Sequence, residues 1–203
     1  MTIEALPQPY RCLSRLDDDV YADLLEAAAF RCCFWRNQTQ GLPVLCPYAL
    51  VLTDAWWHQL STWSEALYSE CLEAEQMLLG RPDLQAQLGL GPRLTRALGK
   101  LSPGPRPEVR AMRFDFHWTV DSWRISEANT DVMGGFIESS GVTALMAQCY
   151  RGPIPTGDPA GALADALASH SPVGLMHLTF YSDDRQIMLY LAQRIEQAGG
   201  QDK

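Results

Sequence analysis

Hydrophobic residues recur at three- and four-residue steps between Asp54 and Leu79, and this pattern predicts the longest helix of the chain. Thr53 stands before it as an N-cap, and Asp54 lies in the first turn, where an acid suits the helix dipole. The pattern favours packing of the apolar stripe in a core over a second interpretation, a ligand groove. The stripe comprises Trp56, Leu60, Trp63, Leu67, Cys71, Ala74 and Leu78.

Shorter helical patterns precede and follow this helix. We expect residues 1–102 to form a mainly helical N-terminal region, with further helices over 18–35, 82–90 and 93–98. The proline-rich segment 102–108 then marks the clearest break in the chain, because Pro103, Pro105 and Pro107 cannot lie within a regular element.

A strict alternation follows the break and predicts a β-hairpin. Arg113, Asp115 and His117 share one face of the first strand, while aromatic residues occupy the other face. The second strand runs from Trp123 to Asn129. A two-residue loop at Asp121–Ser122 would place Glu127 among the aromatic residues. A three-residue loop at 120–122 is therefore the favoured interpretation, because it pairs Asp115 with Glu127 and Arg113 with Asn129.

Two carboxylates that face each other across a sheet repel, so this polar face predicts a bound cation. Asp115, Glu127 and the carbonyl oxygen of Asn129 are hard oxygen ligands of the kind that Mg²⁺ accepts together with water and phosphate. Arg113 is suited to hold phosphate oxygens beside the metal. The alternative interpretation is a sheet whose polar face simply meets water.

The segments RFDF and ISEANTD, with the glycine-rich continuation after them, resemble the signature of circularly permuted ATP-grasp proteins, the group that includes glutathionylspermidine synthases. The resemblance implies that Asp115, Glu127 and Asn129 ligate Mg²⁺ and that Arg113 contacts the transferring phosphate. Asp131 matches a further acid of that signature. Gly134 and Gly135 are candidates for close backbone approach to the nucleotide phosphates.

The same resemblance implies an ATP-dependent carboxylate–amine ligase that works through an acyl phosphate, with ATP and Mg²⁺ as cofactors. Catalysis of this kind depends on positioning and charge neutralisation, and Arg113 is its candidate catalytic residue. The acid and amine substrates are not identified by the sequence. The alternative function is a non-catalytic or truncated ATP-grasp-like subunit that acts through protein–protein interaction.

The fold class expected is mixed α+β and α/β. After the helical region, residues 108–170 would form an ATP-grasp-like hairpin with following helices, and residues 171–203 the first βα unit of a Rossmann-like pre-ATP-grasp layer. Val173–Phe180 is nearly continuously apolar, which is typical of a strand buried on both faces. Since a single βα unit cannot complete a parallel sheet, we expect further sequence or a second polypeptide to complete the nucleotide site.

Composition narrows the range of partners. The formal net charge of −8 argues against nucleic acid or an anionic membrane as the principal partner. A secretion signal and a long apolar span are both missing from the sequence, so a cytoplasmic location is expected. The six cysteines lack metal-site spacing, and we expect reduced thiols.

Overall fold

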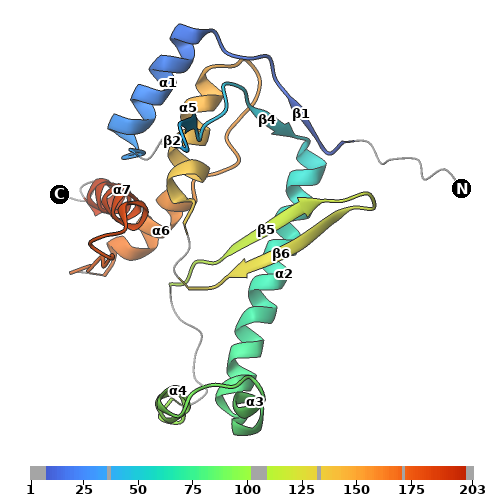
Figure 1. The fold of residues 1–203 in the computed structure, drawn as a ribbon, viewed down its shortest axis with the longest axis vertical. Coiled ribbons are helices and arrows are strands. Elements are labelled where there is room, and N and C mark those ends of the chain that lie inside the picture. Colours follow the sequence, from blue (N-terminus) through green and yellow to red (C-terminus); the bar gives the residue numbers. More distant parts are fainter. Residues whose placement is uncertain (1–7, 36–37, 102–108, 132–133, 171, 200–203) are drawn as a thin grey trace, which may run out of the picture. The chain divides into compact units, whose positions relative to one another are not determined.

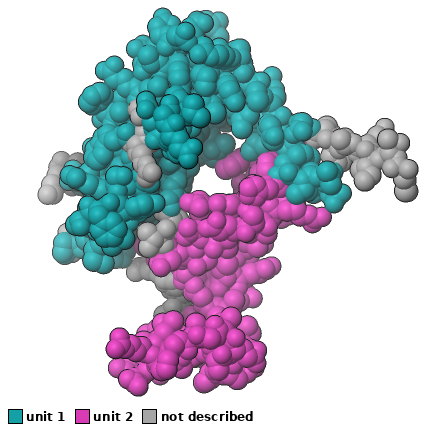
Figure 2. Space-filling view, in the orientation of Figure 1, with its two compact units in different colours: residues 1–53, 118–122, 132–203 teal, residues 54–117, 123–131 magenta. Residues whose placement is uncertain are grey.

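The computed structural model describes residues 8–35, 38–101, 109–131, 134–170 and 172–199 (Figure 1). These residues form two compact units, each discontinuous in sequence (Figure 2). The first contains residues 1–53, 118–122 and 132–203, and the second contains residues 54–117 and 123–131. Within the described residues, helices are combined with small two-stranded sheets, so the expected mixed α and β character is confirmed.

The first unit begins with short elements. Strand β1 (Tyr10–Cys12) pairs antiparallel with β4 (Leu50–Leu52), and α1 (Asp18–Arg31) lies between them in sequence. Strands β2 (Gln38–Thr39) and β3 (Leu42–Pro43) form a minimal hairpin. Its two central residues, Gln40 and Gly41, both have positive φ angles, as a tight turn between antiparallel strands requires.

Four helical segments complete the first unit, and three of them contribute buried apolar residues to its core. They are the π-helical turn η1 (Ile137–Val142), α5 (Thr143–Gln148), α6 (Pro159–Ala168) and α7 (Ser182–Gly199). Helix α6 packs closely on α7 (Figure 1) because its buried face carries only alanine and glycine, at Ala160, Gly161 and Ala164. The largest fully buried aliphatic side chain, Ile137, lies in η1.

The second unit is built on the long helix α2, which spans Asp54–Leu79 as the hydrophobic pattern predicts. Two short helices follow it, α3 (Pro82–Gln87) and α4 (Pro92–Leu98), and each has proline in its first turn. Strands β5 (Arg113–Trp118) and β6 (Trp123–Asn129) then pair as the predicted hairpin, which crosses α2 in Figure 1. The long helix and the hairpin are therefore both confirmed.

The predicted strand over Val173–Phe180 is wrong. Residues 172–178 have no regular secondary structure, and the next regular element is α7. Met176 is 91% exposed and Phe180 is 85% exposed, so this apolar stretch is not buried as a central strand would be. A strand needs a neighbour with which to exchange backbone hydrogen bonds, and no described strand lies beside this segment.

Three further predictions concern the proline-rich break, the cysteines and membrane-spanning segments. The proline-rich break at 102–108 lies outside the described residues. All six cysteines are free thiols; Cys32 and Cys33 are buried, whereas Cys12 and Cys46 are exposed. Among the helices of the described residues, none has the length and apolar character needed to cross a membrane.

Candidate functional site

The candidate site lies on the β5–β6 hairpin, within the second unit. Arg113 and Asp115 are two residues apart on β5, so their side chains emerge on the same face of the strand. The Arg113 guanidinium donates from Nε to Asp115 Oδ1 at 2.8 Å and from Nη2 to Asp115 Oδ2 at 3.1 Å. This two-point geometry fixes the guanidinium plane against the carboxylate.

Glu127, on β6, joins the pair from the neighbouring strand. Its Oε1 lies 4.0 Å from Arg113 Nη2, so one guanidinium stands near two carboxylates. The Arg113, Asp115 and Glu127 side chains are 39%, 34% and 55% exposed. A ligand from solvent can therefore reach all three. Asn129 ends β6 and is half-buried.

The turn of the hairpin differs from the predicted loop. The backbone N–H of Thr119 donates to Ser122 O at 2.9 Å, which leaves Val120 and Asp121 at the centre of a four-residue connection. The three-residue loop expected at 120–122 is therefore wrong. The Thr119 hydroxyl accepts from the backbone N–H groups of Asp121 and Ser122, and this side-chain bonding favours the observed turn.

The opposite face of the hairpin is aromatic and packs within the second unit. The rings of Phe116 on β5 and Trp63 on α2 have centroids 6.3 Å apart and are tilted by 34°, a favourable geometry for an aromatic pair. Leu60, one turn before Trp63, is buried. Part of the apolar stripe of α2 thus serves as the surface that supports the hairpin, as the core-packing interpretation predicts.

A second arginine, Arg110, ties the ends of the hairpin to α2. It donates to both carboxylate oxygens of Glu75, at 2.6 and 2.5 Å, and its Nη2 also donates to the backbone O of Thr130 at 2.9 Å. Thr130 directly follows Asn129, so this arginine fixes the end of β6 at the candidate site. Sequence reasoning missed it, because neither Arg110 nor Glu75 belongs to a spaced motif.

Gly134 and Gly135 belong to the first unit, where they precede η1. Gly135 has a φ of 94°, which favours glycine, and its carbonyl accepts from the Ser139 backbone N–H at 2.9 Å and hydroxyl at 2.7 Å. Its backbone therefore serves to begin the π-helical turn. Their expected contact with phosphate stays a prediction.

The residues fit a hard divalent cation by their chemistry. Within the described residues there is no group of three or more His, Cys, Asp or Glu side chains placed to hold a metal ion. Mg²⁺ does not require such a cage, since it is commonly bound through one or two carboxylates, with waters and substrate phosphates completing its octahedron. Asp115, Glu127 and the Asn129 carbonyl provide a donor set of that kind.

Comparisons of the chain with protein-family models, with curated proteins and with solved structures found no match.

Proposed function

We propose that the chain supplies the Mg²⁺ and γ-phosphate side of the active site in an ATP-dependent carboxylate–amine ligase of circularly permuted ATP-grasp type. The observation that carries the proposal is the convergence of Asp115 and Glu127 on a single guanidinium, that of Arg113, on a solvent-accessible hairpin face. Because the two hairpin strands resemble the ATP-grasp signature, we interpret this face as a site for Mg²⁺ and the γ-phosphate. The finer fold assignment of this hairpin, as ATP-grasp-like, is part of the same proposal.

Each of the four polar residues of the candidate site has a definite role in this proposal. Asp115 and Glu127 would hold Mg²⁺, with the Asn129 carbonyl as a neutral third donor, and the cation would neutralise charge on the nucleotide phosphates. Arg113 would contact the oxygens of the phosphate being transferred. Its guanidinium is permanently charged and presents a planar fork that matches those oxygens. Without a ligand, the same guanidinium compensates the two acids.

The reaction proposed needs no nucleophile from the protein. The substrate carboxylate attacks the γ-phosphorus, the bond to the β-phosphate oxygen breaks, and an acyl phosphate and ADP form. The amine then attacks the acyl carbon, phosphate leaves, and the amine loses a proton as the amide forms. Arg113 stabilises charge on the phosphoryl oxygens during the first step, and Arg110 positions the end of β6 through Glu75 and Thr130.

Isothermal titration calorimetry with an ATP analogue whose β–γ bridge resists hydrolysis tests the proposal. Because the chain supplies only the Mg²⁺ and γ-phosphate side of the proposed site, the purified protein should bind the analogue weakly, but at least tenfold more tightly with Mg²⁺ than without it. Asp115→Asn and Glu127→Gln should each remove most of this Mg²⁺ dependence.

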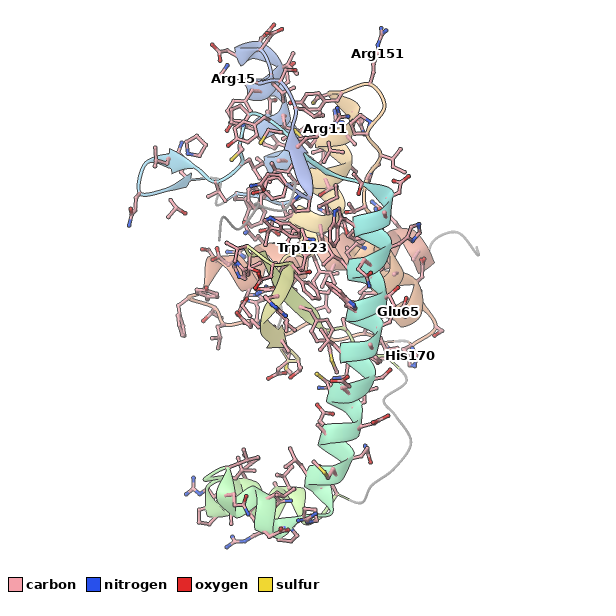
Figure 3. The ribbon with its side chains drawn as sticks, turned by 90° about the vertical axis from the view of Figure 1, so that its right-hand side faces the viewer. Arg11, Arg15, Glu65, Trp123, Arg151 and His170 are labelled. Atoms are coloured by element: carbon pink, nitrogen blue, oxygen red, sulfur yellow. The ribbon has the colours of Figure 1, made fainter. Side chains whose placement is uncertain are left out.

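Two matched variants serve as controls. Asp83→Asn alters an aspartate that makes the same two-point contact with an arginine two residues away, Arg81, but has no role in the proposed site. Glu65→Gln alters an exposed acid of α2, labelled in Figure 3. Both controls should bind as the wild type does. Wild-type binding without Mg²⁺ dependence, or unchanged binding by both hairpin variants, would overturn the proposal.

A further inference from the structure

A cavity of about 540 Å³ lies in the first unit, and none of its lining residues belongs to the hairpin face. Its volume falls within the range of cavities that bind small organic molecules. The end of α1, the η1–α5 segment, the loop before α6 and the part of α7 from Tyr190 onward each contribute to its wall. The cavity is therefore lined by segments of one compact unit and is open to solvent.

Tyr190 of α7 places a polar group in this cavity. The residue is only 5% exposed, and within the described residues its hydroxyl forms no hydrogen bond. The hydroxyl lies over Gly141, since a Cβ added to that glycine would come within 3.0 Å of it. Burial raises the pKa of Tyr190, so the phenol keeps its proton at neutral pH and is available as a donor. Because the hydroxyl lines the cavity, it can donate to a ligand atom there.

The charged groups of the wall favour an anion. The cavity is lined by two guanidinium groups, from Arg31 and Arg194, and by one carboxylate, from Asp158. Asp158 accepts from Arg194 Nη2 and, through Oδ1, from the backbone N–H of Gly161 at 2.9 Å. Its charge is thus compensated within the protein, and the positive charge of Arg31 is left in excess along the wall. Gln193 and Gln197 add amide donors.

The rest of the wall is apolar. Ala144, Leu145 and Pro155 supply hydrocarbon surface to the same wall, so an occupant needs an apolar body as well as an anionic end. We propose that this cavity is a binding site for a small organic monocarboxylate. Its carboxylate accepts from Arg31 and Tyr190, and its body packs on Ala144, Leu145 and Pro155.

Benzoate and its neutral counterpart benzamide test the proposal, because they differ in charge and hardly in shape. Calorimetric titration of the purified protein should give benzoate an affinity at least tenfold higher than that of benzamide. Arg31→Gln and Tyr190→Phe should each lower the benzoate affinity by roughly three- to tenfold and lower that of benzamide by less, because hydrogen bonds to a charged acceptor are stronger. Circular dichroism confirms that each variant is folded.

Two control variants test whether benzoate binds in this cavity and not elsewhere on the protein. Arg151→Gln changes an exposed arginine of the same unit that does not line the cavity (Figure 3), and Asp115→Asn changes the hairpin face. Both should bind benzoate as the wild type does, whether or not the hairpin binds Mg²⁺ and nucleotide. Equal affinity for benzoate and benzamide, no binding of benzoate, or full benzoate affinity in both Arg31→Gln and Tyr190→Phe would each overturn the proposal.

Discussion

Arg110 and Glu75 form two parallel hydrogen bonds, at 2.6 and 2.5 Å, and these bonds join the segment before β5 to the last turns of α2. The two residues are 35 positions apart in sequence. Their side chains are 22% and 40% exposed, so the pair is better shielded from solvent than the Arg81–Asp83 pair of the same unit. The hairpin is therefore held on α2 by the Arg110–Glu75 ion pair at its edge and by aromatic packing on its face.

Arg110→Met should lower the free energy of unfolding by about 1–2 kcal/mol, because it leaves the Glu75 carboxylate and the Thr130 carbonyl without their donor. Partial exposure keeps the loss below that of a fully buried pair. Urea denaturation followed by tryptophan fluorescence measures it. Arg81→Met is the matched control, and it should cost less stability than Arg110→Met, because the Arg81–Asp83 pair is more exposed to solvent. Equal costs for the two variants would contradict a tie through Arg110.

Gly141→Ala should destabilise the first unit by about 1–3 kcal/mol, the usual cost of overpacking. The added Cβ would lie 2.5 Å from Cys32 Sγ and 3.0 Å from the Tyr190 hydroxyl, so neighbouring groups must shift. A second substitution, Cys32→Ala, removes the sulfur and should return part of the loss in thermal denaturation. Gly174→Ala is the control, since a Cβ there meets nothing within 4 Å. A wild-type melting temperature for Gly141→Ala would show that this close packing is absent.

Stability should fall as the pH rises above about 9. Burial raises the pKa of the Cys32 thiol above its ordinary value of 9.0 and that of the Tyr190 phenol above 10.0. At a pH between the ordinary and the raised pKa of each group, the unfolded chain releases a proton that the folded chain retains. The contribution of these two groups to the free energy of unfolding is therefore complete below pH 9, and it is lost as the pH rises through their raised pKa values.

Urea denaturation between pH 8 and 11 measures this dependence. The double variant with Cys32→Ala and Tyr190→Phe should show a shallower decline with pH than the wild type. Tyr181→Phe, at a tyrosine that is 46% exposed, should keep the wild-type slope. A decline that is the same in the double variant would assign the alkaline sensitivity to other groups.

The sequence predicts a helix or strand best where its hydrophobic period repeats several times along the chain. The bounds of α2 follow from its stripe, its Thr53–Asp54 start and Gly80 beyond its end, and all of these are local signals. The alternation of Arg113–Trp118 likewise predicts β5, and with it the shared face of Arg113 and Asp115. These predictions require no knowledge of distant contacts.

Features that depend on distant partners were not predictable. The apolar stretch Val173–Phe180 has the composition of a buried strand, yet strand formation depends on a neighbouring edge that composition does not reveal. The Arg110–Glu75 pair joins two segments whose proximity arises only when the hairpin lies on α2. The length of the hairpin turn depends on one hydroxyl, that of Thr119, whose bonding competes with the alternation pattern.

Because η1 is a π-helical turn, the number of residues in this segment matters for the fold as much as the identity of its side chains. Thr143 N–H donates to Glu138 O, five residues back, so the turn holds a residue more than an α-helix would. Each residue of an α-helix turns the chain by about 100°. Deletion of one residue from 137–142, with closure of a regular α-helix, would therefore rotate α5 by about that angle and carry Ala144 and Leu145 away from the cavity wall. Relatives that keep the cavity should keep this segment free of insertions and deletions, even where its residues differ.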